Sequence, residues 1–482
     1  MKRSPSRSSS SADYGSLLQA TDHLPNFGEM AESSTATKRS MGTDFISNLP
    51  DSLLCHILSF LPTFDAVCTG FLSRRWRHLW KDHQVFDFTD KRIRGTERFE
   101  SFVESVLSQR RCPDIQKFRL KCYSLDDLNA LKRWIHAAVG PSLQEMELNF
   151  FNYQSRDAIS EIFTCASLVS LSLVGYFYMN YIESFHLPML KNLELAVPEV
   201  FVDSSKLISG CPALENLYFV YSGRSTRNYY NDMNLLCPSL KRLNLISGRD
   251  FRYSKISKIQ IDAPNLEFLR IYLEDLCVTP LAVSDFPNMM EASFDISPKA
   301  EHVDWLPELL QALSMTKKLD LGALTTQCLV KAPNLHLPEF SCLSQLRICF
   351  KNFYSGVLMK LLCCCPMLQV LKIDNTGGQQ PGFENPGSIL TEPSSWTQPA
   401  IVPSCVMSDL NTLEFRRYPD SSEEREFFAY ILQNALVLKT ITIYTNVGSY
   451  EKEKEHILNE ISALPRGSSL CQVEEFSYRK WG

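Results

Sequence analysis

A short hydrophobic pattern recurs along this chain about every 25 residues and strongly limits how it can fold. The pattern is P-x-L-x-x-L-x-L with conservative variants. In the clearest stretch its first apolar positions are separated by 22 to 28 residues. Such copies begin at Ile115, Leu143, Leu168, Leu190, Leu214, Leu240, Leu266, Leu343, Leu368, Leu410 and Leu438. A period of this length is typical of leucine-rich solenoids.

Each L-x-L segment has the alternation of a short β-strand, and stacked repeats would place their strands side by side in a parallel sheet. Helical pieces are expected between strands, for example over residues 158–163 and 357–362. The predicted fold class is therefore α/β, with an irregular leucine-rich-repeat solenoid over residues 112–374 and its parallel sheet on the concave face. Residues between the strand leucines should face outward and are candidates for binding a target protein: Glu147, Ser172, Glu194, Tyr218, Asn244, Arg270, Lys372 and Glu414.

The chain has sixteen cysteines, which we expect to be reduced thiols because no secretory signal precedes them. Five of them lie three residues before the first position of a repeat, and this regularity predicts small buried side chains at equivalent turns. These are Cys112, Cys165, Cys211, Cys237 and Cys365. The run Cys363–Cys365 has no CxxC or HxxxH partner, so no metal site is predicted.

A second feature is the apolar segment 49–80, which is too short to form its own core. Leu53, Leu54, Ile57, Leu58 and Leu61 form one stripe of a helix that starts near Pro50. A second apolar group follows around residues 66–72, and a third short helix is expected after residue 73 as its N-cap. The stripe has no evident mate in the repeats. It is either a cap for the solenoid or a docking surface for another protein.

The runs 46–51, 57–63 and 72–80 resemble the F-box of plant F-box proteins. The resemblance implies a Skp-type adaptor as a partner and, through it, a cullin. Phe64 stands where such motifs usually carry a charged residue, and Gly70 interrupts the second helix. The adaptor-binding residues that the resemblance implies are Leu49, Pro50, Leu53, Leu54, Ile57, Leu58, Leu61, Ala66, Val67, Leu72, Trp76, Leu79 and Trp80.

The remaining parts follow from composition and pattern. Residues 1–43 are rich in serine and are predicted to be a disordered tail, residues 44–90 an all-α F-box, and residues 91–111 a linker helix expected to cover part of the stripe. Residues 375–400 read as a loop insertion, in which Trp396 is either a loop anchor or part of a binding surface. Residues 401–482 resemble the FBD region that follows the repeats in many plant F-box proteins, and would cap the solenoid.

A formal net charge of −5 makes no electrostatic case for nucleic acid, and no apolar run is long enough for a membrane span. No catalytic motif or cofactor site is recognised. The resemblance implies a non-catalytic substrate-recognition subunit of a Skp–cullin–F-box ubiquitin ligase, in the nucleus or the cytoplasm. The alternative is a leucine-rich-repeat scaffold that binds proteins outside a ligase.

Overall fold

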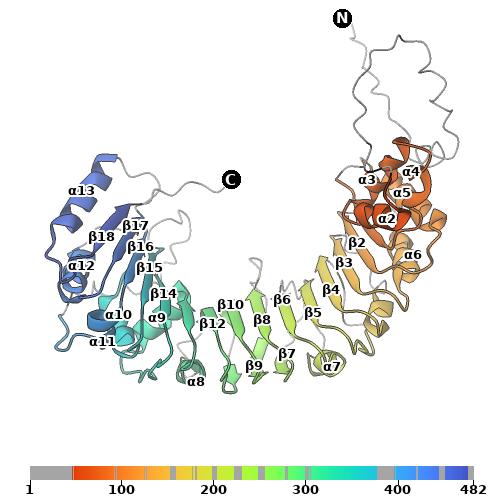
Figure 1. Ribbon diagram of the computed structural model, residues 1–482. Coiled ribbons are helices and arrows are strands. Elements are labelled where there is room, and N and C mark those ends of the chain that lie inside the picture. Colours follow the sequence, from red (N-terminus) through yellow and green to blue (C-terminus); the bar gives the residue numbers. More distant parts are fainter. Residues whose placement is uncertain are drawn as a thin grey trace, which may run out of the picture. The chain divides into compact units, whose positions relative to one another are not determined.

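Figure 1 shows the computed structural model of the protein. The structure describes Ile46 and residues 48–151, 159–197, 204–221, 231–247, 256–276, 281–298, 303–376, 396–418, 422–444 and 451–475, apart from a few single positions. The predicted tail 1–43 and most of the predicted insertion 375–400 lie outside these ranges. The chain divides into two compact units, residues 1–202 with 209–213, and residues 203–208 with 214–482.

The first unit begins with short helices, as the apolar segment predicts. They are α2 (Asp51–Leu58), α3 (Thr63–Cys68), the 3₁₀ turn η2 (Thr69–Phe71) and α4 (Trp76–Leu79). A proline occupies the N-cap of both α2 and α3, where its missing N–H costs nothing. Helix α3 ends before the buried Gly70, which lies in the tighter turn. The predicted cap at residue 73 is wrong, because α4 begins after Arg75.

A parallel sheet follows in the first unit, in the order β1-β2-β3-β4-β5. Its strands are β1 (Val85–Thr89), β2 (Lys117–Cys122), β3 (Glu145–Phe150), β4 (Ser170–Gly175) and β5 (Asn192–Val197), with α5 (Thr96–Gln109), α6 (Leu128–Ala138) and η3 (Ser160–Thr164) between them. The linker helix is confirmed as α5. The all-α description of residues 44–90 is wrong at its end, since β1 adds a strand with Phe86 and Phe88 buried.

The second unit continues the same pattern with a parallel sheet in the order β6-β8-β10-β12-β13-β14-β15-β16-β17-β18. These strands are β6 (Asn216–Tyr221), β8 (Arg242–Ser247), β10 (Phe268–Leu276), β12 (Glu291–Pro298), β13 (Lys318–Leu321), β14 (Gln345–Phe350), β15 (Val370–Asn375), β16 (Thr412–Arg416), β17 (Thr440–Tyr444) and β18 (Gln472–Glu475). The strands from β6 to β17 in this sheet follow the spacing of the repeat, so the parallel sheet predicted from the repeat is confirmed; β18 lies after the last copy.

A smaller parallel sheet in the second unit was not predicted. It consists of β7 (Asn231–Leu236), β9 (Ile256–Asp262) and β11 (Leu281–Val283), in the order β11-β9-β7. These strands lie between the main strands, where helices were expected. Ile259 and Ile261 are buried, and such β-branched residues favour a strand over a helix.

Helices occupy the other connections: α7 (Ser204–Ser209), α8 (Trp305–Ala312), α9 (Ala323–Lys331), α10 (Ser355–Cys363), α11 (Ser404–Ser408), α12 (Ser422–Asn434) and α13 (Glu451–Ala463). The apolar face of α12 is buried through Phe427, Phe428 and Ile431. The indole ring of Trp396 lies 5.4 Å from the ring of Tyr430 and 6.2 Å from that of Phe427, which supports its reading as a loop anchor.

The repeat cysteines are mostly buried as the spacing predicts. Cys165, Cys211, Cys237 and Cys365 are all buried, whereas Cys112 is half-buried. The thiols of Cys165 and Cys237 donate to backbone carbonyls of the preceding repeat, at 3.8 and 3.7 Å. Within the described ranges we find no group of His, Cys, Asp and Glu that could hold a metal ion. Nor is any helix in those ranges long and apolar enough to cross a membrane.

Candidate interaction surfaces

Large apolar side chains are exposed on the N-terminal helices and their flanks. Ile57 on α2 is 42% exposed, Leu53 is 48% exposed, and Leu72 is 71% exposed. We call the six exposed apolar residues of this segment the helix surface: Ile46, Leu53, Ile57, Phe60, Phe71 and Leu72. Several exposed apolar side chains so close in sequence are more typical of a protein-binding site than of solvent-facing helices.

The structure divides the thirteen residues predicted to bind an adaptor. Six remain at least partly accessible: Leu49, Pro50, Leu53, Ile57, Leu61 and Leu72. Seven are buried within the chain: Leu54, Leu58, Ala66, Val67, Trp76, Leu79 and Trp80. The sequence offered no mate for the stripe in the repeats and predicted that the linker helix covers part of it, and the structure shows that more than half of the predicted residues are buried. The inner half of the stripe packs inside the first unit and supports the outer half, so the prediction of partner contact narrows to the accessible residues.

Polar contacts hold the helices in place beneath this surface. Arg75 forms an ion pair with Asp51 at 2.6 Å and also donates to the carbonyl of Leu49, which joins the start of α2 to the residue before α4. The buried hydroxyl of Thr63 accepts a hydrogen bond from the backbone N–H of Asp87 at 2.7 Å. Since Asp87 lies in β1, this bond attaches α3 to the sheet.

The packing of the Phe64 side chain explains why this position departs from the family pattern. Its ring lies 5.8 Å from that of Phe102 on α5, and Phe102 in turn makes an edge contact with Phe88 of β1 at 6.2 Å. A charged residue at this position would face an aromatic cluster. The linker helix thus contacts the N-terminal helices, as expected, and this packing fixes them against the first strands.

The second candidate surface is the outward face of each sheet. In the first unit the register aligns Asp87, Arg119, Glu147, Ser172 and Glu194 across five strands. The three residues predicted there, Glu147, Ser172 and Glu194, therefore share one row. Asp87 lies in an F-x-F segment and Arg119 in an F-x-L segment, which are aromatic variants of the L-x-L pattern. Including these variants would have added both residues to the predicted set.

The same row in the second unit contains the other five predicted residues: Tyr218, Asn244, Arg270, Lys372 and Glu414. The register adds Ser293, Asp320 and Arg347, which lie between Arg270 and Lys372. Asp320 and Arg347 each stand between two repeat leucines or isoleucines, so the pattern could have identified them. We call these two alignments, one in each unit, the polar rows.

Charged residues of the polar rows are largely paired within the protein. In the first unit Lys121 and Glu147 approach to 2.8 Å, and Ser172 donates to Glu194 at 2.7 Å. In the second unit Arg347 bridges Asp320 at 3.1 Å and the buried Asp374 at 3.2 Å. Acids and bases are thus mixed along the face instead of forming a patch of one sign, although Arg347 and Lys372 are neighbours in the register.

Burial and pairing shift the proton equilibria of these acids in opposite directions. Burial raises the pKa of Asp320 despite the neighbouring Arg347. Burial would also raise the pKa of Glu414, but the hydrogen bond and charge of Arg416, with those of Lys372, hold that pKa below its ordinary value. Glu414 contacts Arg416 at 2.6 Å and Lys372 at 3.2 Å, so it is the better neutralised of the two acids.

Comparison with known proteins decides the family. A model of the F-box domain matches residues 46–88, and one of the FBD matches residues 398–443. A model of the LRR repeats of FBD-associated F-box protein At5g56370 matches residues 131–290. F-box/LRR-repeat protein 13 of Arabidopsis thaliana is 31% identical over 470 residues, which cover 92% of this chain and 99% of that protein. The chain belongs to the F-box/LRR-repeat family.

Other relatives carry all three parts in their names. F-box/FBD/LRR-repeat protein At4g26340 of Arabidopsis thaliana is 29% identical over 448 residues, 89% of this chain and 99% of that protein. The F-box match places the helix surface in an F-box, and this domain implies a Skp-type adaptor as partner. The combination of F-box and LRR repeats implies an F-box protein of the Skp–cullin–F-box type, a class whose members are in general non-catalytic.

Proposed function

We propose that this protein is the substrate-recognition subunit of a Skp–cullin–F-box ubiquitin ligase. The F-box would bind the Skp-type adaptor, and through it a cullin, while a polar row binds the target. The observation that carries the proposal is the exposed apolar helix surface within the F-box. Fully burying a leucine or isoleucine side chain contributes about 1.5–3 kcal/mol, so covering several of them would stabilise an adaptor complex.

The protein itself would contribute no chemical step. In this role it raises the effective concentration of a bound target near a ubiquitin-loaded enzyme, and catalysis comes from proximity. The polar rows suit target recognition because paired charges and hydroxyls at fixed register favour one complementary partner and disfavour others. We also propose a nuclear or cytoplasmic location, which imaging of a fluorescent fusion of the full chain would test.

Co-expression of the full chain with a plant Skp-type adaptor tests the first half of the proposal. We expect a stable complex that survives size-exclusion chromatography and a further complex when a cullin is added. Failure of a folded full-length protein to bind any of several adaptors would refute the ligase function. Proximity labelling in plant cells with the intact chain, and with a variant that no longer binds the adaptor, would then identify the target.

One observation supports the alternative, in which the helices act mainly as a cap. The inner half of the stripe is buried, and Thr63 and Phe64 attach the helices to the rest of the first unit. A scaffold that acts outside a ligase would need only this packing. The two functions differ in one measurable respect, since only the ligase function requires the exposed Leu53 and Ile57.

A further inference from the structure

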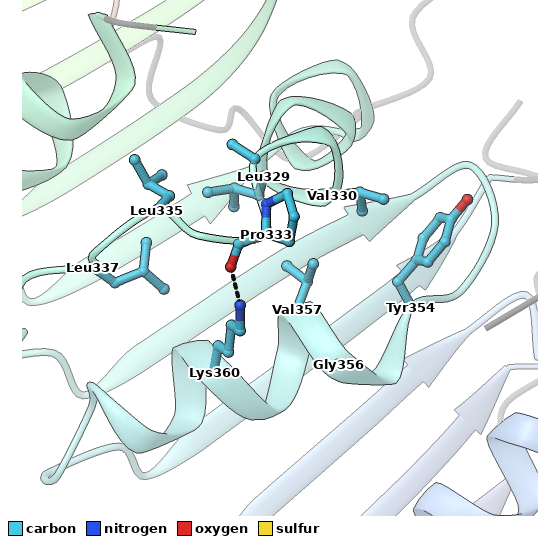
Figure 2. Close-up of a pocket in the computed structure, with 10 residues that line it drawn as sticks. Leu329, Val330, Pro333, Leu335, Leu337, Tyr354, Gly356, Val357 and Lys360 are labelled. Atoms are coloured by element: carbon cyan, nitrogen blue, oxygen red, sulfur yellow. Dashed lines mark hydrogen bonds between the residues drawn. The ribbon is translucent and has the colours of Figure 1, made fainter. Parts of the chain in front are cut away.

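The second unit contains a pocket away from the polar row, between α9 and α10. Its volume is about 370 Å³, which lies within the usual range for small-molecule sites. Figure 2 shows how the two helices and the segment between them surround it. Leu329 and Val330 come from α9, Leu335 and Leu337 from the connecting segment, and Val357 from α10. Aliphatic side chains from α9, from α10 and from the segment between them therefore line the pocket.

One cation lies at this aliphatic pocket. Of the ten described residues that line it, Lys360 carries the only charge and none is acidic. Its ammonium group donates to the backbone carbonyl of Pro333 across the pocket, as Figure 2 shows. An ammonium group has three donors, so this bond leaves capacity for an anionic ligand. The phenol of Tyr354 is the other polar side chain of the lining.

Gly356, which is exposed, also lines this pocket. It lies in the first turn of α10, and its φ is not in the left-handed region. A Cβ atom built on this residue would meet no atom within 4 Å. Neither backbone conformation nor crowding therefore requires glycine here, although glycine is a poor helix former. A side chain at this position would occupy open space beside the pocket.

We propose that this pocket binds a small amphiphile, an unbranched aliphatic carboxylic acid of medium chain length. The chain would lie among Leu335, Val357 and their neighbours, and the carboxylate would accept hydrogen bonds from Lys360. Gly356 would keep the entrance open. A charge-assisted hydrogen bond to the ammonium group would distinguish the acid from the matching alcohol. This site goes beyond the proposed ligase function and does not depend on it.

Calorimetric titration of the full chain with decanoate and with decanol tests the proposal. We expect saturable binding of one decanoate and about two- to fivefold weaker binding of decanol, because Lys360 is exposed and an ion pair of an exposed group contributes little. Lys360→Met keeps the aliphatic stem and should lower decanoate affinity to that of decanol. Lys331→Met is the matched control, because Lys331 is exposed at the end of α9 but does not line the pocket.

Gly356→Leu separates pocket filling from loss of charge. This variant should fold with an unchanged or higher melting temperature and lose decanoate binding at least about tenfold, because its side chain enters unoccupied space. Equal affinity for decanoate and decanol, normal binding by the leucine variant, or no binding by the intact chain would each overturn the proposal. Adaptor co-purification with the leucine variant should stay normal, so failure of this site and failure of the ligase function are distinguishable.

Discussion

The helix surface and the polar rows, for which we propose two different protein partners, have opposite chemistry. The helix surface exposes apolar side chains such as Phe60 and Leu72, while its ion pair between Arg75 and Asp51 lies at the start of the helices. The polar rows combine acids, bases and hydroxyls, and the apolar residues of the same strands are buried on the other face of the sheet. Apolar burial supplies affinity without direction, whereas charged contacts supply register and selectivity.

Under the proposed function, this contrast would let one chain bind a shared adaptor and a selected target. Binding of a shared adaptor can draw its affinity from the burial of apolar side chains. The buried residues of the same helices then hold these exposed side chains in place. A selective target site needs fixed polar groups. Arg347 is fixed because two acids hold it, and Lys372 is held by Glu414. Substitutions on the helix surface should therefore change binding, while those in the rows should also change stability.

The largest expected effect comes from placing charges on the helix surface. The double change Leu53→Asp and Ile57→Asp should weaken adaptor binding at least about a hundredfold, because apolar contact is replaced by desolvated carboxylates. The melting temperature of the chain should change little, since Leu53 is 48% and Ile57 42% exposed. Binding is measured by surface plasmon resonance and melting by scanning calorimetry.

Leu436→Asp is the matched control for that double change. Leu436 is 58% exposed but lies at the other end of the chain, so its replacement should leave adaptor binding intact. A loss of binding in this control as well would show that charge alone is responsible. Unfolding of the double variant would instead favour the cap function over the ligase function.

The second prediction concerns the layer beneath that surface. Phe102→Ala removes a buried ring that contacts both Phe64 and Phe88. It should lower the free energy of unfolding by about 3–5 kcal/mol, the usual cost for a core phenylalanine. Urea denaturation followed by circular dichroism measures this change. Leu53→Ala should change it by no more than about 0.5 kcal/mol, and an equal loss in both variants would break the division into outer and inner layers.

The repeats were predictable because their signal is periodic. Each L-x-L pair had to alternate between core and outward face, and the register aligns all eight predicted residues in rows within their units. The prediction that all eight are accessible is wrong for Glu414, which is buried beside Arg416 and Lys372. Arg347 lies in the clear copy that begins at Leu343 and could have been included, whereas Asp320 lies between Leu319 and Leu321, outside the clear copies of the pattern. The small sheet of β7, β9 and β11 was not predictable by this route, since its strands belong to no copy of the pattern.

The helix surface was only half predictable for a different reason. Helical periodicity groups Leu53, Leu54, Ile57 and Leu58 on one broad stripe and cannot say where its boundary with solvent lies. That boundary depends on tertiary packing, in which Leu54 and Leu58 are fully buried and their neighbours are not. The Phe64–Phe102 contact joins residues 38 positions apart, which no local pattern reports.

The third prediction compares the ion pairs of Arg347 in the second unit with those of Arg119 in the first. Arg347→Met leaves Asp320 without its hydrogen-bonded cation and the buried Asp374 with Arg417 alone. We expect a loss of about 1–3 kcal/mol in the free energy of unfolding. Arg119→Met in the first unit is the control, since Arg119 is 40% exposed and approaches Glu145 and Glu147 only to 3.6 and 3.5 Å. Exposed pairs of this kind contribute about 0–1 kcal/mol. Equal losses would mean that burial does not distinguish the two rows.

The smallest effect is a pH dependence within the second row. Because Arg416 and Lys372 hold the pKa of Glu414 below its ordinary value, the unfolded chain takes up a proton on this carboxylate at higher pH than the folded chain. The pair therefore stabilises the fold above a pH of about 4.3, the ordinary glutamate pKa, and this contribution is lost as the pH falls through the lower folded value. Asp320 has the opposite sign, since its raised pKa contributes stability at low pH that is lost as the pH rises.

Glu414→Gln should thus reduce the acid loss of stability between about pH 5 and pH 3, by no more than about 1 kcal/mol. Urea denaturation at several pH values measures it, with Asp320→Asn as the control that should steepen the same curve. A steeper curve for the glutamine variant would contradict the assignment of Glu414 as the well-neutralised acid, and would place the acid sensitivity of this row elsewhere.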